Sequence, residues 1–600
     1  MDRVEPKAAS KRPGMGATLY GSGVSFRVWA PHADRVFVTG EFNDWSETSL
    51  FDEGNGFWSV DVEQAKADQE YKYIIRNGEE TLIKNDPYAR LLTHSAGNSV
   101  IFDTAYDWEY DIFHAPSWNE MIIYEMHVGS FTRGKNDAPG DFHGAIERIP
   151  HLKELGINTI KVMPPSEFSG PFSMGYNPSH IFSVEVDYGG ARAFKDFIKA
   201  AHKSGIAVII DVVYNHFGPG DLDLWQFDGW QQNDMGGIYF FNDWRAETPW
   251  GSTRPDYTRQ EVRSYIRNNV MMWLEEFHLD GIRWDATAYI RNVKGNNHDD
   301  NDLPEGWSLL QWINDEIKSK QPWAISIAED LKDSDVILKS TAEGGAGFDA
   351  QWDGASVYRI RETLLTPDDS SRDMEAVRSV LEKRYGSDVF SRVIYYQSHD
   401  EVNQHGRLIE SIDADNPESF FALKRASLAS VLLLSSPGVP MFFQGDEFLD
   451  ISGLKEGVFL DWSLANSHAG FVRLFSDLIH LRKNASGLSA GLTGQGLNVF
   501  HVNRKEKIIA FHRWKEGGHR DDTVVVMNFS VKDVKDYRLG LPKKGLWKVR
   551  FNSDSKGYCE SFHDTAVFDF EATEEERDGL PFSGTVSLGP YSAVILSLDD

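Results

Sequence analysis

The chain is poor in cysteine, in positive charge and in long apolar runs, and each lack excludes a class of protein. Its 600 residues include one cysteine, Cys559, so no internal disulfide can form. A formal net charge of −30 repels nucleic-acid phosphates and anionic lipid headgroups. No apolar run is long enough to span a bilayer, and Met1–Lys7 lacks the apolar core of a secretory signal. We expect a cytoplasmic monomer or weak homo-oligomer with no nucleic-acid or membrane partner.

The length and composition predict several folded domains. Six hundred residues exceed the roughly 250–300 that one core can hold. Hydrophobic residues make up 41% and aromatic residues 13%, as in ordinary globular proteins, and no low-complexity segment is present. The whole chain should therefore fold.

Short strand patterns occupy both ends of the chain. From Val24 to about Asp103, apolar runs broken by Gly, Asn and Asp are typical of an antiparallel β-sandwich. Strand patterns return from about Leu497 onward, at 523–529 and 593–596. We predict an N-terminal β-sandwich at 1–112 and a C-terminal β-sandwich at 491–600.

Between these ends, buried strands alternate with amphipathic helices, which predicts repeated βα units. Eight strand candidates appear, at 122–125, 157–163, 206–210, 281–284, 324–328, 348–350, 393–396 and 439–443. We therefore predict a multidomain α/β protein with a central (β/α)8 barrel over 113–490. Its length requires insertions. The Trp-rich loop 218–257 is the main one, and its aromatic rings either bind sugars or pack the loop.

Four of these strands lead directly into acidic residues. The acidic residues, with their neighbours, are Asp211, Asp285 after Arg283, Glu329, and Asp400 after His399. A single carboxylate at such a place most often caps the next helix. Four in one barrel predict an active site, because the carboxyl ends of barrel strands form one face.

Paired carboxyl groups are what glycosidic cleavage needs, one to attack the sugar and one to protonate the leaving oxygen. Arg283 would favour the ionised form of Asp285, the candidate nucleophile. Glu329 follows an apolar strand, an environment that keeps a carboxyl protonated as an acid. His216, His399 and Asp400 could hydrogen-bond the hydroxyls of the reacting sugar.

At these residues the chain resembles glycoside hydrolase family 13, the α-amylase family. The matching segments are Asp211 to His216, Gly281 to Asp285, Ala328-Glu329 and Ser398 to Asp400. The N-terminal runs Phe26 to Pro31 and Gly40 to Trp45 resemble a carbohydrate-binding family 48 module.

The resemblance implies specific roles for residues of this sequence. It implies that Asp285 is the nucleophile, Glu329 the acid/base and Asp400 the third carboxylate, with retention of the α-configuration. It further implies substrate-binding roles for Tyr176, Asp211, His216, Arg283 and His399. No cofactor is required by this resemblance, although Asn215 matches a calcium ligand of many α-amylases.

The family leaves the reaction open, because either water or a sugar hydroxyl can resolve the intermediate. The segment Ser398 to Val402 and the N-terminal module resemble glycogen branching enzymes, so we expect branching of α-1,4-glucans such as starch and glycogen. A hydrolytic α-amylase and a maltooligosyltrehalose trehalohydrolase are the enzymatic alternatives. A catalytically inactive glucan-binding protein is the non-enzymatic one.

Overall fold

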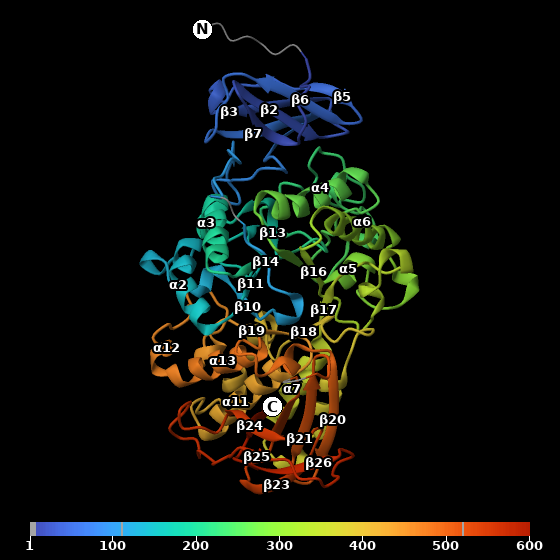
Figure 1. The fold of residues 1–600 in the computed structure, drawn as a ribbon. Coiled ribbons are helices and arrows are strands. Elements are labelled where there is room, and N and C mark those ends of the chain that lie inside the picture. The colour runs from blue at the N-terminus through green and yellow to red at the C-terminus, as the bar shows by residue number, and fades with distance from the viewer. Residues whose placement is uncertain (1–7, 110–111, 519–520, 600) are drawn as a thin grey trace.

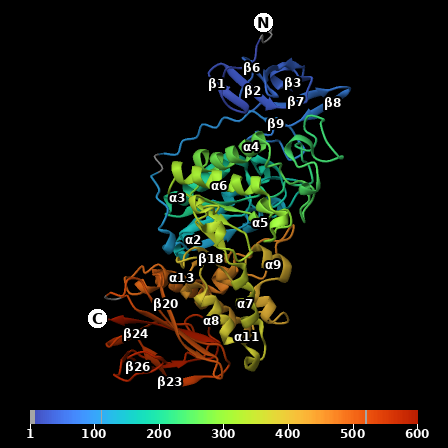
Figure 2. The same ribbon diagram turned by 90° about the vertical axis from the view of Figure 1, so that its right-hand side faces the viewer.

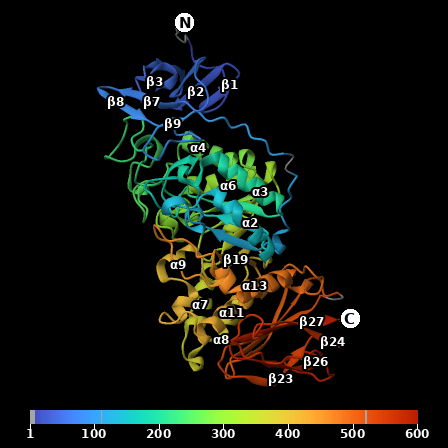
Figure 3. The same ribbon diagram turned by 90° about the vertical axis from the view of Figure 1, so that its left-hand side faces the viewer.

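The computed structural model describes residues 8–109, 112–518 and 521–599. Met1–Lys7, on which the prediction of no secretory signal depends, lies outside these residues. Figure 1 shows three parts arranged along the molecule, with the N-terminal strands at one end, the barrel in the middle and the C-terminal strands at the other end. Figures 2 and 3 show the same order from the two sides.

The central part is a closed barrel of eight parallel strands, which confirms the predicted (β/α)8 fold. Strand β19 pairs with β10 and closes the ring. The barrel strands, in order around the ring, are β10 (Ile123–Met126), β11 (Thr159–Val162), β14 (Ala207–Val212), β15 (Gly281–Trp284), β16 (Ile325–Ala328), β17 (Ala350–Trp352), β18 (Arg392–Ile394) and β19 (Val439–Phe443).

Helices lie around this ring; α1 to α11 occur between its strands in the chain, and α12 and α13 follow the last strand. Their apolar faces pack on the strands, as Phe194, Phe197 and Ile198 of α3 do. The helices of this part are α1 (Val128–Phe131), α2 (Phe142–Leu155), α3 (Gly190–Lys203), α4 (Gln260–Met271), α5 (Thr287–Arg291), α6 (Pro304–Lys320), α7 (Gly354–Leu365), α8 (Met374–Glu382), α9 (His399–His405), α10 (Leu408–Ile412), α11 (Phe420–Ser435), α12 (Leu464–Ser467) and α13 (Ala469–Arg482).

Among the strand ends that differ from the sequence prediction, two affect residues of the site. The strand expected at 348–350 begins at Ala350 and continues to Trp352, because Gln351 and Trp352 are buried and Asp353 then caps α7. The strand expected at 393–396 ends at Ile394. Asp400 therefore lies in the first turn of α9, after the cap Ser398, rather than directly after a strand.

The N-terminal part is built of two antiparallel sheets, as predicted. One has the order β1-β2-β6-β5, and the other has the order β4-β3-β7-β8 with β9 paired to β7. Tyr71 and Tyr73 are fully buried in its core. The strands are β1 (Gly16–Tyr20), β2 (Gly23–Trp29), β3 (Arg35–Gly40), β4 (Thr48–Ser49), β5 (Phe51–Gly54), β6 (Phe57–Val62), β7 (Glu70–Asn77), β8 (Glu80–Lys84) and β9 (Ser99–Val100).

The C-terminal part is also antiparallel and packs on α11 and α13. A buried ion pair of 2.6 Å between Lys424 on α11 and Asp554 joins it to the barrel. Its strands are β20 (Gly496–Asn503), β21 (Ile508–Trp514), β22 (Thr523–Asn528), β23 (Val534–Leu541), β24 (Leu546–Asn552), β25 (Phe570–Glu571), β26 (Phe582–Leu588) and β27 (Ser592–Asp599). The domain boundaries at 112/113 and 490/491 stay predictions.

The two remaining strands, β12 (Ser166–Phe168) and β13 (Pro178–Val184), form a hairpin inserted after β11. The loop 218–257 packs against the N-terminal sandwich. Trp230 stacks on His32 with ring centroids 4.8 Å apart, and Asp228 hydrogen-bonds the same histidine. This part of the loop is therefore packing. Trp244 and Trp250 remain exposed.

Across the described residues, every helix is too short or too polar to cross a membrane.

Candidate active site

The barrel brings the predicted acidic residues to one end of the strands. Asp211 on β14 lies beside Arg283 on β15 in the strand register. Trp284 and Ala328 are likewise paired, so Asp285 and Glu329 follow neighbouring strands directly. Both carboxylates are almost fully buried, with 7% and 6% of their surface exposed. The prediction that acids directly follow barrel strands therefore holds for Asp285 and Glu329, whereas Asp211 lies within β14, one residue before its end.

Arg283 is the centre of the cluster. Its Nη1 donates to Asp211 Oδ1 at 2.9 Å and to Asp285 Oδ1 at 3.0 Å. Its Nη2 lies 2.8 Å from Glu329 Oε2. One buried guanidinium thus serves three carboxylates, and it cannot fully compensate the charge of all of them.

Glu329 consequently favours its protonated form. Burial raises the pKa of Glu329 to about 8. Arg283 acts against this shift, while the charges of Asp285 and Asp400 add to it. The backbone N–H of Ala286 donates to Glu329 Oε2 at 2.8 Å and fixes the carboxyl in place. A carboxyl that holds its proton at neutral pH can act as a general acid.

A second group of charged residues, not predicted from the sequence, contacts the cluster from β10 and β11. Lys161 lies 2.8 Å from Glu125 Oε1 and also forms an ion pair with Asp211. Burial alone would raise the pKa of Glu125, but Lys161 and His399 outweigh it and lower that pKa well below its usual range. Trp352 lies under both cations, 4.1 Å from the Arg283 guanidinium carbon.

Lys161 should matter for stability far more than a surface lysine. Lys161→Met leaves the buried carboxylates of Glu125 and Asp211 without their shared cation, which should cost about 3–5 kcal/mol in the free energy of unfolding. Lys203→Met is the matched control, because Lys203 pairs with Glu109 at the surface and should change stability little. Urea unfolding of both variants measures the difference. Equal effects would contradict the role of Lys161.

His399 is oriented by Glu125 of this group. Its Nδ1 donates to Glu125 Oε1 at 2.8 Å and its backbone N–H donates to Glu125 Oε2 at 2.9 Å. Burial lowers the pKa of His399, but Glu125 and Asp400 outweigh burial and raise it. Nε2 lies 3.7 Å from Asp400 Oδ1. His399 is thereby held as a hydrogen-bond donor beside Asp400.

Asp400 is the most exposed of the three candidate catalytic acids, with 43% of its side chain accessible. The neighbouring Glu401 instead takes the capping role, because its carboxylate accepts from the backbone N–H and hydroxyl of Ser398. The two adjacent acids therefore differ in their contacts, which their sequence positions alone did not settle.

Tyr176 and His216 complete the predicted set. The Tyr176 hydroxyl donates to Asp211 Oδ2 at 2.6 Å, and its ring stacks on His399 with centroids 4.7 Å apart. Burial lowers the pKa of His216 to about 4, so its ring is neutral at physiological pH. The exposed Trp250 stacks on His216 at 4.8 Å. All eight predicted site residues thus belong to one connected cluster.

Asn215, the candidate calcium ligand, is engaged in hydrogen bonds here. Its amide nitrogen donates to Asp285 Oδ2 at 2.8 Å, and its oxygen accepts from His216 Nδ1 at 2.5 Å. Among residues 8–109, 112–518 and 521–599, no group of three or more His, Cys, Asp or Glu side chains is arranged to hold a metal ion. The amide of Asn215 thus helps to position Asp285.

Comparisons with known proteins agree with this geometry. Residues 125–225 and 222–455 match the model of the α-amylase catalytic domain. Residues 14–89 match carbohydrate-binding module 48, the isoamylase N-terminal domain, and residues 500–599 match the α-amylase C-terminal all-β domain.

Similar curated proteins cover nearly the whole chain. The 1,4-α-glucan branching enzyme of Aquifex aeolicus is 29% identical over 95% of this chain and 93% of its own. That of Dechloromonas aromatica is 30% identical over 97% and 96%. Among solved structures, a pullulanase from Paenibacillus barengoltzii in complex with maltohexaose and α-cyclodextrin has a TM-score of 0.74 at 19% identity, covering 99% of this chain and 96% of its own. With the catalytic-domain match spanning more than half its length, this chain belongs to the α-amylase family, glycoside hydrolase family 13, as its sequence motifs predicted.

Proposed function

We propose that the protein is a 1,4-α-glucan branching enzyme, which cuts an α-1,4 chain and joins the cut end to a 6-hydroxyl of another glucan. The observation that carries the proposal is the cluster around Arg283, in which Asp285 and Glu329 share one guanidinium while Glu329 retains its proton. Two carboxyl groups in opposite protonation states are what a retaining glycosidase needs.

The proposed reaction has two steps. In the first, Asp285 attacks the anomeric carbon while Glu329 gives its proton to the leaving 4-oxygen, so the glycosidic bond breaks as the ester to Asp285 forms. In the second, Glu329 takes the proton of the incoming hydroxyl, whose oxygen attacks the same carbon and releases Asp285. Two inversions leave the α-configuration unchanged.

The remaining site residues hold the sugar in this proposal. Tyr176 offers its ring to the reacting sugar, and His216, His399 and Asp400 hydrogen-bond its hydroxyls. Asp400 contributes most when the ring flattens in the transition state, because those hydrogen bonds then strengthen. Arg283 and Asp211 position the nucleophile.

Transfer rather than hydrolysis is supported by the full-length similarity to proteins named branching enzymes. Similarity to pullulanases at about 20% identity supports the fold only. The carbohydrate-binding module 48 match supports an α-glucan as the substrate. A cytoplasmic location and a metal-independent reaction are part of the same proposal.

Incubation of purified protein with amylose tests the reaction. We expect new α-1,6 signals in the proton NMR spectrum together with few new reducing ends. Short reducing oligosaccharides without α-1,6 signals would make the protein an α-amylase. A separate incubation with maltooligosyltrehalose tests the third alternative, because release of trehalose would make the protein a trehalohydrolase.

A further inference from the structure

Glu125 is a carboxylate of the barrel interior to which the proposed reaction gives no direct part. It lies on β10 and is fully buried, so it cannot touch a sugar. Both of its oxygens nevertheless bind one residue of the site, because Oε1 accepts from His399 Nδ1 at 2.8 Å and Oε2 accepts from the His399 backbone N–H at 2.9 Å. The ring of Tyr176, stacked on His399 at 4.7 Å, fixes the plane of the imidazole.

The bond to Glu125 decides which nitrogen of His399 carries a proton. An ionised carboxylate can only accept, so Nδ1 must donate to it. A neutral His399 would then have a lone pair at Nε2, the nitrogen that lies 3.7 Å from Asp400 Oδ1, and two acceptors would face each other. A second proton turns Nε2 into a donor. The charge of His399 therefore determines what the site offers to a sugar hydroxyl.

The space between His399 and Asp400 suits a bridging hydroxyl. At 3.7 Å the nitrogen and the oxygen are too far apart to bond each other directly. A hydroxyl that approaches both groups can donate to the Asp400 carboxylate and accept from Nε2–H. This pairing of a donor with an acceptor exists only while His399 is an imidazolium.

The groups around His399 favour this charged form. Burial disfavours it, but Glu125 and Asp400 outweigh burial, so the pKa of His399 is raised above its usual value. Lys161 acts against the shift. His127 also faces this ring, but burial lowers the pKa of His127 to about 4, so it adds no charge at neutral pH.

Lys161 keeps Glu125 ionised without neutralising it fully. It pairs with Glu125 at 2.8 Å and also with Asp211, so one cation is divided between two carboxylates. Tyr176 donates its hydroxyl to Asp211 at 2.6 Å and stays neutral, because burial raises its pKa. Part of the charge of Glu125 therefore remains for His399.

We propose that Glu125 is a positioning residue that keeps His399 as an imidazolium, so that His399 and Asp400 together hold one hydroxyl of the reacting sugar. The inference rests on the proposed chemistry of Asp285 and Glu329 but not on the acceptor, because the sugar is held in the same way whether water or a 6-hydroxyl resolves the intermediate. Cleavage of amylose therefore tests it separately from branching.

The variant Glu125→Gln keeps the shape of the side chain and removes its charge. The quantity to measure is the kcat/KM of the unaltered protein divided by that of the variant, for amylose cleavage between about pH 5 and 8. This ratio should be small at the acidic end, where His399 of the variant still takes its second proton. It should rise to about 10–100-fold at the alkaline end, the scale of one charged hydrogen bond. Glu329 titrates in both proteins, so its effect cancels, and a ratio that does not change with pH would overturn the proposal.

A double variant shows whether Glu125 acts through His399. In the background His399→Gln, which has no ionisable ring, adding Glu125→Gln should change kcat/KM by less than about twofold at every pH. Losses that simply add would mean that Glu125 affects activity by another route.

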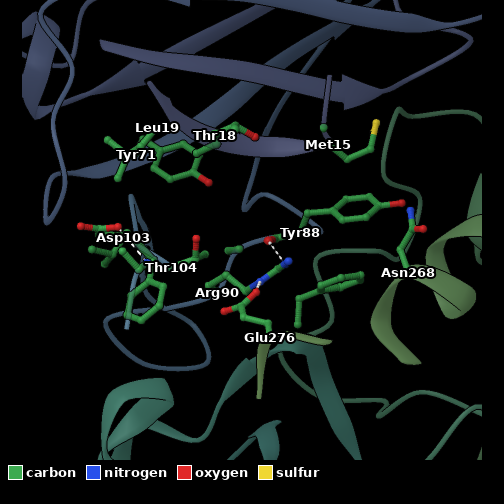
Figure 4. A pocket seen from close by; sticks show the side chains of 17 residues that line it. Met15, Thr18, Leu19, Tyr71, Tyr88, Arg90, Asp103, Thr104, Asn268 and Glu276 are labelled. Carbon is green, nitrogen blue, oxygen red and sulfur yellow. Dashed lines mark hydrogen bonds and ion pairs between the residues drawn. The ribbon is translucent and has the colours of Figure 1, made fainter. Parts of the chain in front are cut away.

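The matched control is Glu276→Gln. Figure 4 shows Glu276 beside Arg90 at the junction of the N-terminal sandwich and the barrel, and Lys195 pairs with the same carboxylate at 3.0 Å. This carboxylate also lies between two cations, but it precedes β15, whereas the catalytic acids follow barrel strands. The ratio for this variant should stay the same at every pH, and a rise like that of Glu125→Gln would contradict a specific role for Glu125.

The unaltered protein gives a second measurement, which holds even if Glu125→Gln fails to fold. In protein labelled with ¹³C-histidine, the Cε1–H signal of His399 is identified by its loss in His399→Gln. At pH 6.5, where an ordinary histidine is half protonated, this signal should be mainly that of an imidazolium. A mainly neutral ring at that pH would refute the proposal.

Discussion

Replacement of Glu329 by glutamine should lower kcat on amylose by about 10³–10⁴-fold, the scale of a lost general acid. Glutamine keeps the shape of the side chain and can still accept from the Ala286 N–H, but it has no proton to give to the leaving oxygen. Initial rates of chain cleavage measure the loss. An activity within tenfold of the unaltered protein would exclude Glu329 as the acid.

The control for this variant is Asp330→Asn, one residue further along the chain. Asp330 is also buried, but it pairs with Arg291 at 2.7 Å and takes no part in the cluster around Arg283. It should retain most activity. A loss as large as that of Glu329→Gln would mean that any carboxylate removed at this strand end disturbs the site.

The pKa of Glu329 also predicts a pH dependence. Since the acid must be protonated, kcat/KM should fall as the pH rises through about 8. Stability follows from the same shift. The unfolded chain loses this proton near 4.5, whereas the folded chain keeps it to about 8, so the protein loses stability between these values. Glu329→Gln has no such proton and should lack this loss.

Removal of the nucleophile should have an even larger effect. Asp285→Gly should reduce turnover of amylose by roughly 10⁴–10⁶-fold, as expected when a covalent catalyst loses its attacking group. Arg283 keeps its contacts with Asp211 and Glu329, so the cluster should remain folded. A thermal melt of the variant checks that point.

Azide distinguishes a lost nucleophile from a damaged site. With α-maltosyl fluoride as the donor, azide can enter the space left by the carboxylate, attack the anomeric carbon and displace fluoride. A single displacement inverts that carbon, so the product should be the β-glycosyl azide. Absence of rescue in a folded variant, or an α-configured product, would contradict the role of Asp285.

The sequence was informative where a strand ends in an acid. Buried strands had to run parallel in a barrel, and their carboxyl ends had to meet, so Asp211, Asp285 and Glu329 could be grouped without coordinates. The same logic placed Asp400 near them. It could not place Asp400 in the first turn of a helix, because the capping of α9 by Ser398 and Glu401 depends on where β18 ends.

The supporting residues Glu125, Lys161 and Trp352 were missed. A signal was present, because a lysine inside the apolar run Thr159–Val162 must point into the barrel and find an anion there. Finding the partner requires the pairing of β10 with β11, which places Glu125 opposite Lys161. The sharing of Arg283 among three carboxylates likewise depends on the spatial arrangement of neighbouring strands.

For the aromatic residues of the loop 218–257, a single sequence cannot decide between sugar binding and packing of the loop. Trp230 and Trp250 occur in the same insertion with similar neighbours. Only the packing of the loop under the N-terminal sandwich separates Trp230, which stacks on His32, from Trp250, which is exposed beside His216. Long insertions carry too few local constraints to be placed from periodicity.

The most direct test of the account counts two products in one sample of amylose treated with the purified protein: new α-1,6 linkages by proton NMR and new reducing ends by a copper-based assay. A branching enzyme should form several-fold more linkages than reducing ends, and both products should disappear in Glu329→Gln. Reducing ends without linkages would contradict transfer to a 6-hydroxyl, and linkages that persist in Glu329→Gln would contradict the catalytic site.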